Sequence, residues 1–182
     1  MYPKNQWIEL NAFSFYKNWQ TPSGFLCGTY ASSVLLAYYQ DVLAKPTIPV
    51  TTRQPFENQK KLIDILQPIL QPIDLPTVPL QISFGLNWYF HKYQLPFRAR
   101  STSIGSWQRV TKRILAGEPV MIGLAKYFGS TYGNHWVVVH GFYESNDGQR
   151  YYKIHDNWGA TEKIIPARWG NGTISLQEIK TK

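Results

Sequence analysis

The sequence predicts an α+β fold, in which an N-terminal helical lobe packs on a C-terminal antiparallel β-sheet. Two observations support this prediction. Residues 27–44 carry apolar side chains at three- and four-residue spacings, which indicates a core-facing helix. Residues 134–143 are almost continuously apolar and β-branched, which indicates a buried strand. The length of 182 residues suits a single domain spanning residues 1–182.

The helix expected over residues 27–44 begins at Cys27, the only cysteine of the chain. A loop over residues 20–25 precedes it, and Pro46 follows it. The partial positive charge at a helix N-terminus stabilises a thiolate, so a thiol in the first turn gains reactivity. A free cysteine is also often simply buried as a small apolar residue. Position alone therefore leaves both interpretations of Cys27 open.

Residues 46–80 form a proline-rich connector that contains seven of the twelve prolines. One helical stretch is expected inside it, over residues 57–66. Because proline fixes the backbone, we expect a stiff connector, which either borders the cleft or crosses the surface between the two halves. Residues 84–93 then indicate a short aromatic helix.

The second half begins with a helix that starts at Ser106 and stops at Gly117, followed by a strand that leads to residue 123. His135 opens the next strand. Alternation along that strand places His135 and His140 on opposite faces, so they do not form a metal-ligand pair, and we expect His140 to be a core or half-buried residue. One cysteine and scattered histidines give no zinc pattern, so we expect neither a metal nor a cofactor.

A hairpin turn at residues 144–148 returns the chain into a strand over residues 149–154. In antiparallel pairing the end of this strand lies beside the start of the previous one. Asp156 or Asn157 is therefore expected near His135. Residues 163–165 and 172–177 read as closing strands.

Two blocks in this half carry a family resemblance. Asn134-His135-Trp-Val-Val-Val-His-Gly-Phe142 and Asp156-Asn-Trp-Gly159 are similar to the Asn-His-Ala-Val…Val-Gly-Tyr and Asn-Ser-Trp-Gly blocks of papain-like cysteine peptidases. The order of cysteine, histidine and orienting residue also matches. Within that superfamily the chain looks closest to bacterial peptidases related to the double-glycine leader peptidases of bacteriocin export. The resemblance covers residues 11–45 and 100–160, about two thirds of the chain.

The resemblance implies a papain-like fold and a role for each matching residue. Cys27 would be the nucleophile, and His135 its general base and acid. Asp156 would orient the imidazole and favour a thiolate–imidazolium pair, with Asn157 as the competing assignment. Gln20 would donate to the oxyanion together with the Cys27 backbone N–H, although it lies seven residues before the cysteine where the family usually shows six. Trp158 would cover the imidazole or serve as a core aromatic.

The function that the resemblance implies is that of a cysteine peptidase, which hydrolyses peptide bonds through a Cys-His-Asp triad and a thioester acyl-enzyme. A peptide or protein would be its substrate, for example a bacterial leader or cell-wall peptide. Two alternatives remain open at this point. One is an acyltransferase or transglutaminase-like enzyme that resolves the same thioester with an amine, and the other is a noncatalytic binding module.

The charge distribution and the hydropathy of the chain argue against a nucleic-acid-binding protein and against a membrane-spanning protein. The net charge is +8, but the basic residues are dispersed, so we interpret them as solvated surface and do not expect nucleic-acid binding. No run of 18 apolar residues indicates a transmembrane segment, and the N-terminus of this chain shows no signal peptide. The sequence does not fix a compartment, and an extracellular or cell-wall location stays open.

Overall fold

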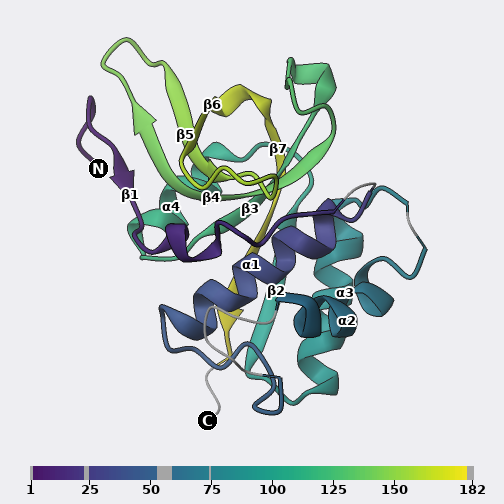
Figure 1. Ribbon diagram of the computed structural model, residues 1–182. Helices are drawn as coiled ribbons and strands as arrows, with labels where there is room; N and C mark the ends of the chain where they lie inside the picture. The colour runs from purple at the N-terminus through teal and green to yellow at the C-terminus, as the bar shows by residue number, and fades with distance from the viewer. Residues whose placement is uncertain (1, 23–24, 53–58, 74, 180–182) are drawn as a thin grey trace.

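The computed structural model describes residues 2–22, 25–52, 59–73 and 75–179 (Figure 1). Helices α1, α2 and α3 gather in one half, and most of the sheet lies in the other (Figure 1). The described residues form four α-helices and seven antiparallel strands, which confirms the predicted α+β class. None of these helices is long and apolar enough to cross a membrane.

Helix α1 spans Cys27–Asp41, and Cys27 is its first residue. It confirms the helix expected over residues 27–44, although it ends three residues earlier. Most of its side chains are buried, because α1 contacts strands β3 and β4 on one side and α2 on another. The helix that carries the cysteine is thus fixed against the sheet that carries the histidine.

The connector holds more helix than its prolines suggest. Helix α2 spans Gln59–Leu70 and continues through Pro68, beyond the expected end at residue 66. Leu66 and Leu70 are both fully buried, so the gain from burying Leu70 favours the extra turn despite the proline. The expected start at residues 57–58 lies outside the described residues. Helix α3 spans Pro79–Lys92 and begins five residues earlier than expected, with Pro79 in its first turn.

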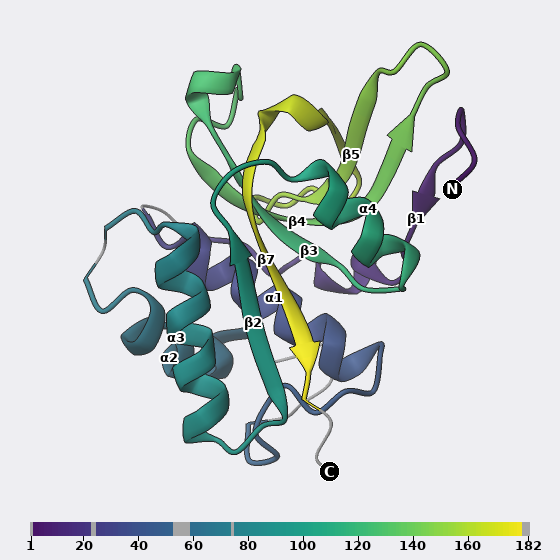
Figure 2. The ribbon, with the colours of Figure 1, turned by 180° about the vertical axis from the view of Figure 1, so that it is seen from behind.

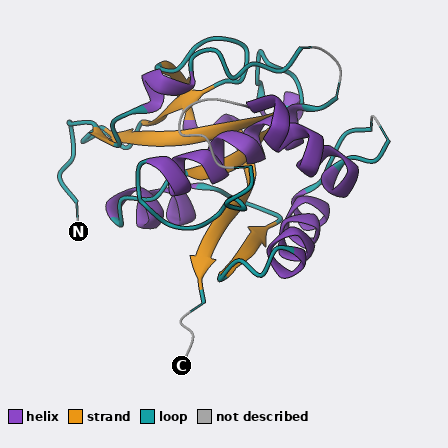
Figure 3. Cartoon of the chain, turned by 60° about the horizontal axis from the view of Figure 1, so that its bottom comes forward, coloured by secondary structure: helices purple, strands orange, loops and turns teal. Residues whose placement is uncertain are grey.

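The six strands that form the main path of the sheet have the order β2-β7-β3-β4-β5-β6, and β1 pairs with β4 outside this path. The bounds are β1 Ile8–Glu9, β2 Phe97–Thr102, β3 Val120–Leu124, β4 His135–Glu144, β5 Arg150–His155, β6 Lys163–Pro166 and β7 Gly170–Glu178. The predicted hairpin of β4 and β5 is confirmed. Strands β2 and β7 run antiparallel to each other, β7 leads to the C-terminus, and helix α3 packs against both (Figure 3).

Strand β4 lies inside the sheet, and its two faces pack against different layers. Trp136 and Val138 belong to the cluster that includes α1, whereas Val137 and Val139 belong to the cluster that includes helix α4 (Trp107–Leu115). Figure 2 shows α4 and α1 on opposite sides of the sheet. The expected alternation along this strand is confirmed.

His140 is fully buried, as expected of a core residue. Its ring stacks on Phe13 at a centroid distance of 4.2 Å, and Nε2 lies 2.7 Å from the carbonyl oxygen of Thr161. Burial lowers the pKa of His140 to about 4. His140 is therefore neutral at physiological pH, and its ring contributes to the packing of the core.

Candidate active site

Cys27 and His135 line the same cavity, whose volume is about 570 Å³. Cys27 comes from the start of α1 and His135 from the start of β4, so the cavity lies where the two halves meet. Residues 76–79 of the connector also line it, which favours the first of the two alternatives considered for this segment. The other lining residues are mostly apolar: Phe25, Pro76, Thr77, Val78, Pro79, Gly123, Leu124, Ala125, Asn134, Trp136, Trp158 and Asn171.

The Cys27 thiol is partly buried and lies 3.9 Å from the carbonyl oxygen of Phe25. Burial raises the pKa of the thiol, because the thiolate is poorly solvated there. The backbone N–H groups of Trp136, Gly28 and Cys27 itself act in the opposite direction, since they stabilise negative charge on sulfur. Burial has the larger effect, so the free protein holds a neutral thiol surrounded by donors.

The His135 imidazole is held by the main chain of Asp156. Its Nε2 lies 2.7 Å from the Asp156 carbonyl oxygen, and the residue is only 5% exposed. A carbonyl oxygen can only accept a hydrogen bond, so Nε2 carries the proton and Nδ1 remains the basic nitrogen. Burial lowers the pKa of His135, and the neighbouring Asp156 only partly offsets this effect.

The Asp156 carboxylate binds other groups. Its Oδ2 accepts a hydrogen bond of 3.0 Å from the Tyr132 hydroxyl, and its Oδ1 accepts from the N–H groups of Trp158 and Ala160 at 2.8 and 2.9 Å. Residue 156 therefore holds the imidazole through its backbone, while its side chain fixes the turn that follows β5. This differs from the carboxylate–imidazole contact that the family resemblance implied.

Asn157 has a structural role in this geometry. It is fully buried, and its amide donates to the Trp136 carbonyl oxygen at 2.8 Å and contacts His155 Nδ1 at 3.1 Å. Its φ of +59° lies in the left-handed region, which asparagine tolerates better than most residues. Asn157 thus ties the turn to β4 through Trp136, and residue 156 is the one whose backbone binds the imidazole.

Two aromatic rings cover the imidazole. Trp158 lies at a centroid distance of 4.3 Å from the His135 ring, and Tyr132 stacks near it at 5.7 Å with an interplanar angle of 7°. Sequence reasoning anticipated Trp158 but missed Tyr132. The position of Tyr132 in the loop before β4, three residues ahead of His135, is the feature of the sequence that could have indicated its place beside the imidazole. Together the rings restrict the imidazole and shield it from water.

Gln20 lies at the edge of this arrangement and does not line the cavity. Its side-chain amide donates to the Lys17 carbonyl oxygen at 3.2 Å and lies against Gly159. The structure therefore places Cys27 and His135 on one cavity, with the Asp156 backbone bound to the imidazole, and it does not place Gln20 on that cavity. Among the described residues there is no group of three or more histidine, cysteine, aspartate or glutamate side chains that could hold a metal ion.

Comparison with known proteins supports the fold. No protein-family model and no curated protein sequence matches the chain. A structure of a C39-like peptidase from Bacillus anthracis matches 97% of this chain and 100% of its own, with a TM-score of 0.55 and 14% identity. The bromelain protease from Ananas comosus, solved with the E64 inhibitor, matches the same shares with a TM-score of 0.52 and 10% identity. The chain thus has a papain-like cysteine peptidase fold, as the sequence predicted.

Proposed function

We propose that the chain is a cysteine peptidase in which Cys27 is the nucleophile and His135 the general base and acid. One observation carries the proposal. Cys27 and His135 line one cavity, and the Asp156 carbonyl oxygen engages Nε2 of the imidazole, so Nδ1 is available as the base. A thiol, a basic nitrogen and a group that orients the imidazole are the components of nucleophilic acyl transfer.

The proposed reaction needs one proton to move twice. His135 Nδ1 takes the thiol proton as sulfur attacks the carbonyl carbon of the peptide bond, and it then gives this proton to the departing amine. Water attacks the resulting thioester with the same nitrogen as base, which releases the acid product and restores the thiol. The raised pKa of Cys27 and the lowered pKa of His135 both favour a neutral pair before substrate binds.

The oxyanion of the tetrahedral intermediate requires donors near sulfur. The N–H groups of Cys27, Gly28 and Trp136 lie close enough to stabilise charge on sulfur. We propose that the Cys27 N–H is one donor and that Gln20 is the second after its amide leaves the Lys17 carbonyl oxygen. One such donor stabilises a transition state by about 3 kcal/mol.

The proposed substrate is a peptide or protein, since the cavity is open and mostly apolar around two reactive side chains. Residues 76–79 form one part of its wall, so we assign them a role in selecting substrate side chains. Bacterial leader peptides and cell-wall peptides are the first to be assayed.

A peptide library tests the proposal. The wild-type chain is incubated with the library and with free amines, and the products are identified by mass spectrometry. We expect hydrolysed products from the wild type and none above background from Cys27→Ala, because the alanine variant cannot form the thioester. Equal cleavage by Cys27→Ala would refute the proposal, and amine-coupled products in place of hydrolysed ones would indicate an acyltransferase.

A further inference from the structure

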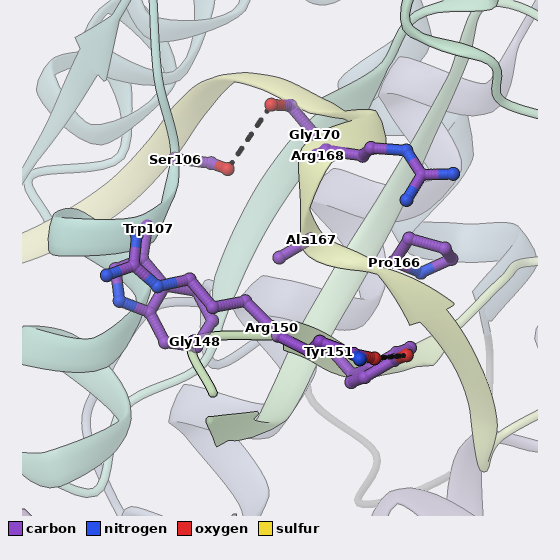
Figure 4. A pocket seen from close by; sticks show the side chains of 10 residues that line it. Ser106, Trp107, Gly148, Arg150, Tyr151, Pro166, Ala167, Arg168 and Gly170 are labelled. Atoms are coloured by element: carbon purple, nitrogen blue, oxygen red, sulfur yellow. Dashed lines mark hydrogen bonds between the residues drawn. The ribbon is translucent and has the colours of Figure 1, made fainter. Parts of the chain in front are cut away.

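A second concave surface lies apart from the Cys27 cavity and shares no lining residue with it. It consists of two adjoining cavities of about 460 and 660 Å³, which have Ser106, Trp107 and Arg150 in common. The first cavity continues along residues 166–168, as Figure 4 shows, and the second along the start of α4. We call this continuous surface the basic groove.

All charged side chains of the described residues that line the basic groove are positively charged. Arg109, Lys112, Arg150 and Arg168 line it, and no described acidic residue does. Of these four cations only Arg150 forms an ion pair with a described residue, through its contact with Glu144 at 3.0 Å. A concave surface lined by unpaired cations concentrates positive potential and attracts anions.

Arg150 is held in place before any ligand binds. Its Nε donates to Glu144, and its guanidinium carbon lies 4.8 Å from the centroid of the Trp107 ring. Glu144 also accepts from the Tyr2 hydroxyl at 2.6 Å, and that hydroxyl accepts from Trp107 Nε1 at 3.2 Å. The Glu144 contact uses Nε, so the terminal N–H groups of Arg150 remain for a carboxylate. Preorganised arginines bind carboxylates at low entropic cost.

The apolar parts of the groove narrow the choice of anion. Trp107, Pro166 and Ala167 lie among the cations, so a ligand that brings methylene groups beside its charges gains contacts there. Tyr152 stacks on Trp107 at a centroid distance of 5.6 Å, and the Arg150 guanidinium also packs on the Trp107 ring. The indole therefore already has two packing partners, which disfavours it as a stacking platform for the bases of a single-stranded nucleic acid.

We propose that the basic groove binds an acidic polypeptide segment, with glutamate or aspartate carboxylates on Arg150 and Arg168. Binding does not use the Cys27 thiol, so the failure of this proposal and that of the peptidase proposal are distinguishable.

Fluorescence anisotropy tests this binding in the Cys27→Ala background, which prevents cleavage of the probe. The probe is a fluorescein-labelled hexaglutamate peptide, with a hexaglutamine peptide, an oligothymidylate and inorganic tripolyphosphate as competitors. We expect Arg150→Gln with Arg168→Gln to weaken hexaglutamate binding by about tenfold or more, and competition to be weakest from hexaglutamine.

Two further variants separate the groove from the general charge of the protein. Lys112→Gln with Arg168→Gln removes two exposed cations of the groove and leaves the Glu144 ion pair intact, so loss of binding there cannot come from misfolding around Glu144. Lys60→Gln with Lys61→Gln removes two exposed cations from α2 and is expected to change binding less than about twofold. Equal weakening in all three variants, no binding of hexaglutamate, or preference for oligothymidylate or tripolyphosphate would each overturn the proposal.

Discussion

At the scale of single residues, the Asp156 backbone rather than its carboxylate holds the proposed base. The hairpin return made the proximity of residue 156 to His135 predictable from the sequence. The contacting atom was not predictable, because Tyr132 and two N–H groups of the turn compete for the carboxylate. That competition depends on side-chain positions that spacing does not encode.

The substitution Asp156→Asn tests this geometry. An asparagine keeps the backbone carbonyl and offers an oxygen to the N–H groups of Trp158 and Ala160, so we expect kcat/KM to fall by less than about tenfold. His135→Ala removes the base and should cost on the order of 100-fold to 10,000-fold. Steady-state kinetics on a cleaved library peptide measures both. If Asp156→Asn lost as much as His135→Ala, the carboxylate would act on the imidazole directly.

The protonation of Cys27 gives a second prediction at this scale. Burial raises the pKa of the thiol, so the thiolate fraction at any pH below that value is smaller than for an ordinary cysteine. We expect the iodoacetamide alkylation rate to rise with pH, with a midpoint above the usual value of about 8.5. His135→Ala should leave the acidic part of this profile nearly unchanged. A reactive plateau at acidic pH that disappears in His135→Ala would instead reveal a thiolate–imidazolium pair.

At the scale of elements, local patterns predicted α1 from the three- and four-residue spacing of its apolar residues, and β4 from its nearly continuous apolar and β-branched run. They did not predict β2, in which the buried Phe97 and Ala99 alternate with the exposed Arg98 and Arg100, because we interpreted the basic residues as solvated surface. The length of α2 was also missed, because tertiary burial of Leu70 decides it. In such cases tertiary packing overrides the intrinsic secondary-structure propensity of the residues.

Gln71 shows how the connector supports the site. Its amide donates to the carbonyl oxygens of Phe25 and Leu75 at 2.7 and 3.0 Å, and its Oε1 accepts from the Thr29 N–H and hydroxyl at 3.0 and 2.8 Å. One buried side chain thus ties the end of α2 to the start of α1, beside Cys27.

We expect Gln71→Leu to destabilise the fold by about 1–3 kcal/mol, because it leaves buried polar groups unpaired. It should also lower kcat/KM, since the start of α1 is no longer tied to α2. Urea unfolding and kinetics measure the two effects. The matched control is Gln67→Leu in the last turn of α2, whose side chain forms no hydrogen bond with another described residue, so the substitution should be nearly neutral. Wild-type stability in Gln71→Leu would contradict this role.

At the scale of the whole molecule, the proposed site exists only because two halves meet. The sequence predicted both halves and their order, from the helical patterns before residue 100 and from one helix and a series of strand patterns after it. Cys27 and His135 are 108 positions apart, and the packing of α1 on β4 brings them to one cavity. The apolar walls around them could not be predicted, because Phe25, residues 76–79, residues 123–125, Trp136 and Trp158 come from five separate segments of the chain.

A double-mutant cycle on Cys27 and His135 tests most directly whether the two side chains work as one unit. We expect Cys27→Ala to reduce peptide hydrolysis to background and His135→Ala to cost on the order of 100-fold to 10,000-fold, as above. The double variant should be no slower than Cys27→Ala, because the base has no function once the nucleophile is absent. Circular dichroism should show the same fold in all three. Substantial hydrolysis by Cys27→Ala, or losses that multiply in the double variant, would contradict a shared nucleophile and base.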